Sequence, residues 1–218
     1  MLSETWQQIS SELQLPSEIS DDILRYVETK YTEPWRFYHT LKHIEELLHL
    51  SVIYRHEIKN PLFVNLAIIF HDIEYYVDSR SSENEKQSAI TFERVLSLHV
   101  PKPLMDIISA AILATKTHVV DETALNDLKL FMDFDMSILG SDREIYKTYA
   151  MNIRNEYQAI DKAAYCVGRS GFFRKYLEST ANIYSSDYFR SRYETKAREN
   201  IAWECGILEL GELISADS

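Results

Sequence analysis

The segment N-P-L-F-V-N-L-A-I-I-F-H-D-I-E-Y-Y, residues 60–76, contains the longest apolar stretch of the chain and indicates its fold class. Asn60 followed by Pro61 is a typical start for a helix. Apolar residues then repeat at three- and four-residue steps, at Leu62, Leu66, Ile69 and Ile73. The pattern predicts a helix that begins at Asn60-Pro61, buries this stripe and ends near Tyr76.

The same helical period recurs on both sides of this segment, whereas signals for a sheet are missing. Five glycines and five prolines are few for 218 residues, and no alternating β-branched runs occur. No internal repeat, low-complexity tract or linker divides the chain. We therefore expect an all-α protein in which residues 1–218 form a single helical domain, a bundle of about nine or ten helices. The other predicted helices cover residues 5–13, 17 onward, 39–53, 83–99, 104–117, 128–138 and 144–161, with two more before residue 213.

Acidic residues outnumber basic ones, with 34 Asp and Glu against 23 Lys and Arg, a formal net charge of -11 and a pI of about 5.1. Such a chain gains nothing from counterion release on DNA or RNA, so nucleic-acid binding is disfavoured. The N-terminus lacks the pattern of a signal peptide, and the longest apolar stretch is far short of the ~20 residues that a membrane span needs. The sequence thus predicts a cytoplasmic protein without nucleic-acid or membrane partners.

His71 and Asp72 stand together at the end of the most apolar predicted helix. An unpaired buried carboxylate is very costly, so Asp72 needs a partner. A hydrogen bond to a histidine, a salt bridge to a distant arginine and a bound metal ion all explain the pair. The dipeptide alone does not decide between them.

Further imidazoles and carboxylates favour the metal. His39 and His43 are four residues apart and so share one face of the predicted helix 39–53. Asp133 and Asp135 lie within an otherwise apolar segment, and His118 ends another apolar helix. Imidazoles and carboxylates in about equal numbers are a ligand set for Mn, Fe, Co, Ni or Zn rather than for Ca.

The order His, then His-Asp, then Asp along the chain resembles the signature of the HD superfamily of metal-dependent phosphohydrolases. More narrowly, the sequence is similar to an uncharacterised branch of that superfamily with a Tyr-His-x-x-x-His start. The resembling segments are residues 38–44, 70–75, 82–89, 114–118, 133–140, 154–157 and 194–200. The resemblance runs from about residue 35 to residue 205 and implies the HD-type helical fold over that core.

The resemblance also implies a metal centre, whose ligands are His43, His71, Asp72 and Asp135. Asp133 is the rival for the last place, since the Asp-x-Asp pattern of the family leaves one residue of ambiguity. The expected cofactor is one divalent transition metal, Mn, Fe, Co, Ni or Zn, with Mg as a further option. In relatives with two metals, extra histidines hold the second ion, and here His118 is the candidate for that role.

The implied reaction is the hydrolysis of a phosphate ester of a small phosphorylated compound, above all a nucleotide, by a metal-activated water. The candidates for proton transfer are Glu74, Glu85 and His118. The candidates for substrate binding are His39, Arg154 and Arg198, and arginine suits the task because it grips phosphate bidentately. Many family members have another residue where Glu74 stands, and some have a lysine, which puts the leaving-group chemistry in doubt.

Other interpretations stay open at this stage. A metal-bound HD protein without hydrolase activity would be an oxygenase, which needs two irons, or a ligand sensor. Alternatively, the chain is a helical interaction module in which the motif only stabilises the fold. Individual residues also have structural alternatives. An arginine that faces a glutamate commonly forms only a salt bridge, and Glu85 can be a solvated side chain. His39 can orient a metal ligand from outside the coordination shell. The oligomeric state is open, with a dimer among the options.

Overall fold

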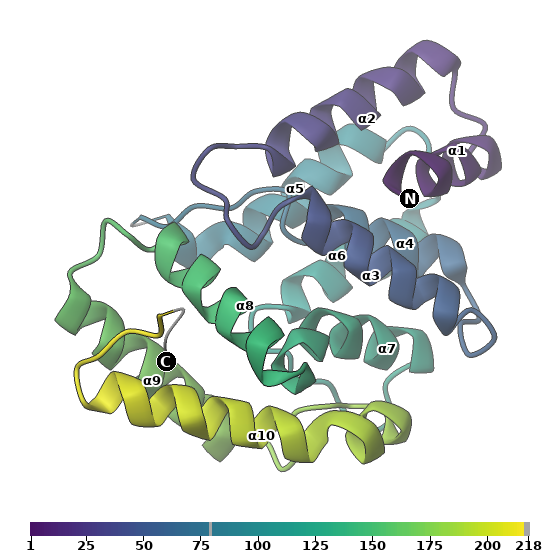
Figure 1. Ribbon diagram of the computed structural model, residues 1–218. Helices are drawn as coiled ribbons and strands as arrows, with labels where there is room; N and C mark the ends of the chain where they lie inside the picture. Colours follow the sequence, from purple (N-terminus) through teal and green to yellow (C-terminus); the bar gives the residue numbers. More distant parts are fainter. Residues whose placement is uncertain (79, 216–218) are drawn as a thin grey trace. The chain divides into compact units, whose positions relative to one another are not determined.

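The computed structural model describes residues 1–78 and 80–215 of the chain (Figure 1). These residues form ten α-helices and two short 3-10 helices without a β-strand, which confirms the predicted all-α fold. The α-helices are α1 (Leu2–Glu12), α2 (Ser17–Tyr31), α3 (Leu41–Ile53), α4 (Pro61–Phe70), α5 (Asn84–Leu96), α6 (Lys102–Ala114), α7 (Asn126–Asp135), α8 (Arg143–Glu156), α9 (Lys162–Ser179) and α10 (Asp187–Glu209). The 3-10 helices are η1 (Ser81–Glu83) and η2 (Met136–Gly140).

The helices gather into two compact units, Met1–Phe131 and Met132–Ser218. The boundary falls inside α7, so that the first unit holds α1 to α6 with the start of α7, and the second holds the end of α7 with α8 to α10. The expectation of one domain over residues 1–218 stays a prediction. Among the described residues, none of the helices combines the length and the apolar character that crossing a membrane requires.

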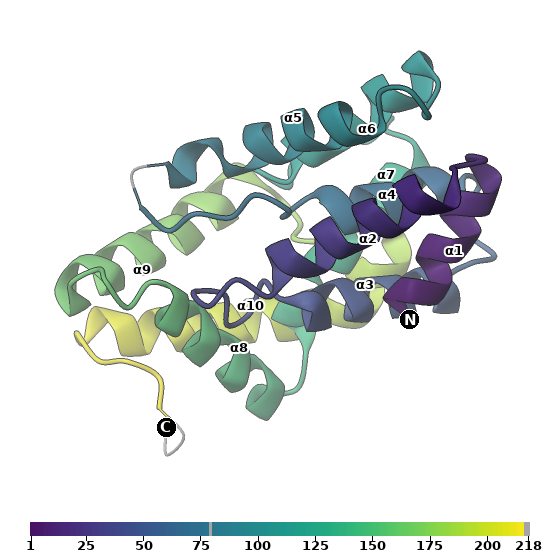
Figure 2. The same cartoon turned by 90° about the horizontal axis from the view of Figure 1, so that it is seen from above.

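Helix α4 is the core helix of the first unit, because α1, α3, α5 and α6 all pack against it. Its start is as predicted: the Asn60 side chain accepts a hydrogen bond from Phe63 N at 3.0 Å, and Pro61 occupies the first turn. Beyond Pro61 each residue of α4 is buried except Asn65. The predicted stripe therefore underestimates the burial of a helix that has neighbours on several sides. Helices α5 and α6 also pack along each other (Figure 2).

Helix α4 ends at Phe70, so the prediction that it continues to near Tyr76 is wrong. Side chains from other segments bind the backbone groups that a longer helix would pair internally. Arg36 donates to the carbonyls of Asp72 at 2.8 Å and Ile73 at 3.0 Å. His71 and Asp72 therefore lie in the turn that follows α4, where helical geometry does not set the directions of their side chains.

Helix α3 begins at Leu41, so the prediction that His39 shares a helix face with His43 is also wrong. Thr40 is the N-cap, with an extended backbone, and the carbonyl of His39 accepts a hydrogen bond from Arg36 at 3.0 Å instead of entering the helix. The two imidazole rings nevertheless lie close together, with their centroids 5.8 Å apart.

In the second unit, α10 packs against η2 and α9. Asn200 of α10 donates to the carbonyls of Leu139 at 2.8 Å and Ser141 at 2.9 Å, on either side of Gly140. A Cβ at Gly140 would lie 2.7 Å from the Cβ of Tyr193, closer than packed carbon atoms approach. The glycine thus permits the contact between α10 and η2.

Candidate metal centre

His71 has its tautomer set by the turn of α4 that precedes it. Its Nδ1 lies 2.9 Å from the carbonyl oxygen of Ile68. A carbonyl can only accept, so Nδ1 carries the proton and donates it. In the neutral ring, Nε2 is then left with its lone pair. Metal-binding histidines commonly have this arrangement, in which the second ring nitrogen donates to a carbonyl and fixes the ring.

The Nε2 atom of His71 faces two further groups of the first unit. It lies 3.0 Å from Oδ2 of Asp72 and 3.3 Å from Nε2 of His43, and His43 Nε2 lies 3.9 Å from the same Asp72 oxygen. Both histidines are buried, each with 1% of its side chain exposed, while Asp72 is half-buried. A lone pair and a carboxylate oxygen repel each other at such a distance unless a proton or a metal ion lies between them.

Two of the three distances between these atoms, 3.0 and 3.3 Å, fit a shared metal ion, whereas the 3.9 Å between His43 Nε2 and Asp72 Oδ2 is longer than the usual distance between two ligands. Two ligand atoms that each lie about 2.1 Å from an ion are roughly 3.0–3.4 Å apart, depending on the coordination geometry. One ligand atom from each of His43, His71 and Asp72 can be chosen so that all lie within 4.8 Å of one another. The structure thus brings together three of the four predicted ligands, and the donor set suits a divalent transition metal.

His39 lies at the edge of this cluster. Its Nε2 is 3.8 Å from Oδ2 of Asp72, the oxygen that also faces His71. The ring stacks on Tyr75, with centroids 4.2 Å apart and an angle of 30° between the planes. This position beside Asp72 agrees with the predicted place of His39 next to the metal, while its role in substrate binding stays a prediction.

Arg36 holds the two segments of the cluster together, a role that no sequence pattern indicates. Its side chain is fully buried and donates to the carbonyl of His39 on one segment and to those of Asp72 and Ile73 on the other. Nε also pairs with Glu33 at 3.1 Å. An arginine in an irregular segment has no periodicity, so only the folded structure reveals its role.

Glu85, one of the candidates for proton transfer, lies on α5 and its role stays a prediction. Its Oε2 atom is buried without a hydrogen-bond partner among the described residues. Burial raises the pKa of Glu85, and the charge of Asp72 acts in the same direction, while Lys116 and His118 oppose it. These interactions link Glu85 of α5 to Asp72, one of the three clustered ligands, and Lys116 is a further nearby cation that the sequence analysis had not singled out.

His118 follows α6 and has a backbone φ of +52°, in the left-handed region. A residue other than glycine rarely adopts this conformation, and such outliers gather at functional sites. Lys116, two residues earlier, donates to the carbonyl of Ser82, beside the start of α5. His118 and Lys116 are therefore part of the same surroundings of Glu85, although proton transfer by His118 stays a prediction.

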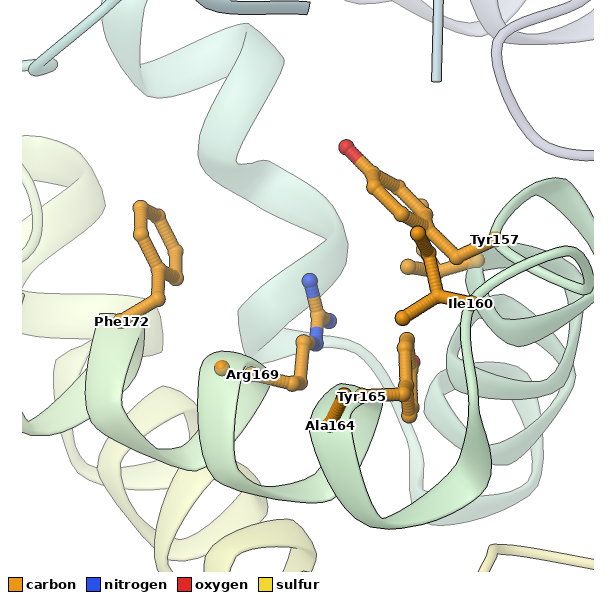
Figure 3. Close-up of a pocket in the computed structure, with 8 residues that line it drawn as sticks. Tyr157, Ile160, Ala164, Tyr165, Arg169 and Phe172 are labelled. Atoms are coloured by element: carbon orange, nitrogen blue, oxygen red, sulfur yellow. The ribbon is translucent and has the colours of Figure 1, made fainter. Parts of the chain in front are cut away.

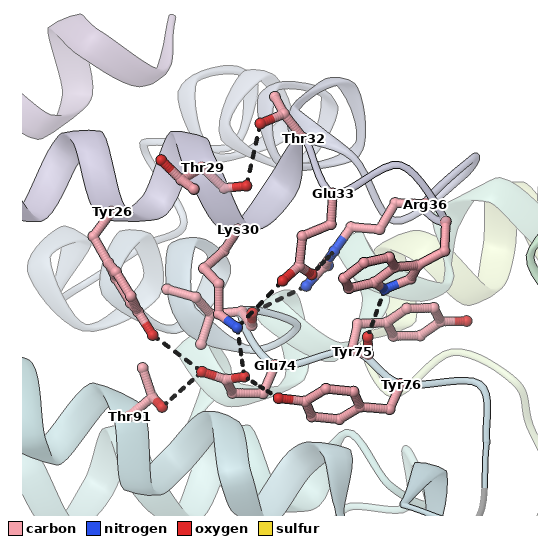
Figure 4. A network of polar contacts seen from close by, with 12 residues as sticks. Tyr26, Thr29, Lys30, Thr32, Glu33, Arg36, Glu74, Tyr75, Tyr76 and Thr91 are labelled. Atoms are coloured by element: carbon pink, nitrogen blue, oxygen red, sulfur yellow. Dashed lines mark hydrogen bonds and ion pairs between the residues drawn. The ribbon is translucent and has the colours of Figure 1, made fainter.

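Glu74 has a different environment, a network of polar contacts with side chains that include Tyr26, Lys30 and Thr91 (Figure 4). Lys30 lies 2.8 Å from its carboxylate. Three hydroxyl groups donate to the same carboxylate at 2.9–3.1 Å, from Tyr26, Tyr76 and Thr91. Burial alone would raise the pKa of Glu74, but the hydrogen bonds from Lys30 and Tyr76 outweigh it and the pKa lies below its ordinary value. These contacts favour a structural role over the predicted catalytic one.

The two aspartates of the Asp-x-Asp motif belong to the second unit and differ in their surroundings. Asp133 is 1% exposed and accepts hydrogen bonds from Ser185 N at 2.6 Å, and from Ser186 N at 2.8 Å and Oγ at 2.5 Å. It thereby fixes the segment that leads into α10. Burial raises the pKa of Asp133 to about 6 against these hydrogen bonds. Because Asp133 is engaged in this way, Asp135 stays the preferred fourth ligand, as a prediction from the sequence.

Both predicted phosphate-binding arginines make contacts within the second unit. Arg154 donates to the carbonyls of Tyr157 at 2.8 Å and Ile160 at 3.0 Å, just beyond the end of α8. Arg198 pairs with Glu194, one turn earlier on α10, at 2.7 Å. The salt-bridge alternative thus describes Arg198 well, and for both residues the role in binding phosphate stays a prediction.

Comparisons of the chain with protein-family models, with curated proteins and with solved structures gave no match. The resemblance to the HD superfamily therefore rests on the motifs of the sequence. What the structure contributes independently is the cluster of His43, His71 and Asp72.

Proposed function

We propose that the chain is a metal-dependent phosphohydrolase that cleaves a phosphate ester of a small phosphorylated compound, with nucleotides as the favoured class. The observation that supports this function best is the convergence of His43, His71 and Asp72 on one point in the first unit. Nε2 of His71 keeps only its lone pair in the neutral ring and lies 3.0 Å from Oδ2 of Asp72 and 3.3 Å from Nε2 of His43, so the lone pair and the Asp72 carboxylate repel each other. A divalent cation relieves this repulsion.

A divalent transition metal bound by these residues would lower the pKa of a coordinated water and polarise a phosphoryl oxygen. The chain's own residues supply the rest of the chemistry. Ile68 keeps the lone pair of His71 aimed at the site by accepting the proton of Nδ1. Arg36 holds the backbone of Asp72 in place by donating to its carbonyl.

Glu85 is the residue we assign to proton transfer. Its Oε2 atom is buried without a partner among the described residues, and its raised pKa lets the carboxyl hold a proton closer to neutral pH than an ordinary glutamate does. Lys116 contributes positive charge in the same surroundings, which favours an anionic substrate. Glu74 has no part in the proposed reaction because its carboxylate is occupied by Lys30 and three hydroxyl groups.

The proposal is tested by assaying the full chain against nucleotides and phosphomonoesters with Mn, Co, Ni, Fe or Zn present. We expect release of phosphate or pyrophosphate that stops when a chelator is added and returns when the metal is restored. Glu85→Gln should lower turnover by roughly 100-fold while it leaves metal binding intact. Glu83→Gln is the control, since Glu83 lies two residues earlier with an exposed salt bridge to Lys86. Absence of turnover with every metal and substrate would contradict the proposal.

A further inference from the structure

The second unit contains a cavity of about 390 Å³ whose lining includes none of the proposed metal ligands (Figure 3). This volume lies in the range of small-molecule sites in proteins, which are mostly apolar with a few polar groups. The lining comes from the end of α8, the segment after it and α9, and consists of Ile153, Tyr157, Ile160, Ala164, Tyr165, Gly168, Arg169 and Phe172.

Small residues on α9 keep the cavity open. Ala164, Gly168 and Phe172 follow one another at four-residue steps and so form one stripe along the helix. A Cβ placed at Gly168 would meet nothing within 4 Å. Gly168 and Ala164 are exposed, so the space beside them opens to solvent, and a side chain added at residue 168 meets no atom at its Cβ.

Arg169 is the charged group of the lining. Figure 3 shows its guanidinium between Phe172 on one side and Tyr157 with Ile160 on the other. Nε pairs with Glu204 at 3.0 Å and Nη2 donates to the hydroxyl of Tyr149 at 3.0 Å. Within the described residues, no hydrogen bond involves Nη1, so its two N–H groups can donate to a ligand from a guanidinium whose side chain is 12% exposed.

A second arginine gives the cavity a positive balance. The guanidinium carbon of Arg154 lies 4.8 Å from the ring centroid of Tyr165, a lining residue. Arg169 is paired with the carboxylate of Glu204, whereas Arg154 donates to backbone carbonyls, so two guanidinium groups stand against one carboxylate here. An anion therefore complements the cavity better than a neutral or cationic group does.

We propose that this cavity binds a small amphiphilic anion, a single carboxylate or related anionic group on a flat apolar body. The anionic group binds Arg169 and is attracted by the charge of Arg154. The apolar body lies between Phe172 and the aromatic rings of Tyr157 and Tyr165. None of the cavity's lining residues is a predicted metal ligand, proton-transfer group or substrate-binding residue of the proposed phosphohydrolase, although Arg154 beside the lining is a candidate for phosphate binding.

The proposal is tested with three probes that share one ring system, 2-naphthoate, 2-naphthalenemethanol and 2-naphthylmethylammonium. Calorimetric titration of the full chain should show that naphthoate binds at least ten-fold more tightly than the alcohol and that the ammonium binds most weakly. Gly168→Leu should weaken naphthoate binding at least ten-fold, since the leucine fills the cavity. Gly206→Leu is the matched control, because Gly206 is also an open helical position but lies outside the lining.

Both leucine variants are expected to fold, since leucine favours a helix more than glycine does, and their circular dichroism and melting temperatures verify this. The proposal is overturned if none of the probes binds, if the alcohol or the ammonium binds as tightly as naphthoate, or if the folded Gly168→Leu and Gly206→Leu variants bind naphthoate equally well.

Discussion

Nε2 of His43 lies 3.3 Å from Nε2 of His71, although the two residues are 28 positions apart in the sequence. The Nδ1 proton of His71 is committed to the carbonyl of Ile68, so His71 cannot donate from Nε2 while its ring is neutral. Its Nε2 atom also lies 3.0 Å from a carboxylate oxygen of Asp72. His71 and Asp72 therefore need a shared cation, either a proton that makes the His71 imidazole charged or a metal ion, and we assign this place to the metal.

Arg36→Lys should weaken metal binding at the proposed centre, although it changes none of the ligands. Lysine keeps the charge opposite Glu33 but cannot donate to the carbonyls of His39, Asp72 and Ile73 at once, as the guanidinium does. We expect metal affinity to fall about 10- to 100-fold, as is typical when groups that orient ligands are lost. Calorimetric metal titration measures this, with Arg55→Lys as control because Arg55 is exposed and donates only to the carbonyl of Ile58. Equal affinity in the two variants would show that Arg36 has no positioning role.

Glu85→Gln should make the protein more stable at pH 7, by about 1 kcal/mol, because it removes a carboxylate whose Oε2 is buried without a partner among the described residues. The sign follows from linkage. The pKa of Glu85 is raised in the folded state, so its contribution to stability is fully present below the unfolded pKa and is lost as pH rises through the folded pKa. The gain over wild type should therefore shrink as the pH is lowered toward the ordinary glutamate range. Urea unfolding at several pH values measures this gain in stability. A Glu85→Gln variant less stable than wild type at pH 7 would contradict the inference that the Glu85 carboxylate destabilises the fold.

Gly140→Ala should destabilise the protein by about 1–3 kcal/mol, the usual cost of overpacking. The new Cβ would lie 2.7 Å from the Cβ of Tyr193, which is fixed to the backbone of α10 and cannot swing away. Gly206→Ala provides the comparison, since its Cβ meets nothing within 4 Å and alanine favours the helix, so a small gain in stability is expected there. Thermal unfolding of both variants distinguishes them, and a Gly140→Ala variant as stable as wild type would be inconsistent with the close packing of α10 on η2.

The helices were predictable from the sequence because apolar residues at three- and four-residue steps form the buried face of a helix. Helix α4, for example, begins at Pro61 as expected. The helix ends were less predictable. Nothing in the local sequence shows that Arg36 binds the carbonyls of Asp72 and Ile73, and this tertiary interaction is what separates the His-Asp pair from the helix.

Adjacency in the sequence was a guide to the metal ligands but not to the groups around them. Glu74 is two residues from Asp72, yet in the irregular turn its side chain points to Lys30. Glu85 comes from a separate helix and is nevertheless linked electrostatically to Asp72. Such relationships depend on how α5 packs against α4, and they are therefore visible only in the folded unit.

The most direct test of the metal centre is a calorimetric titration of Mn²⁺ or Zn²⁺ into the chelator-treated full chain, compared between His43→Gln and His49→Gln. Both histidines lie on α3, but His43 is buried in the cluster and His49 is exposed. We predict about one ion bound per wild-type chain, the same for His49→Gln, and an affinity at least 100-fold lower for His43→Gln. A wild-type chain that binds no ion, or a folded His43→Gln variant that binds the ion as tightly as His49→Gln, would contradict the metal centre.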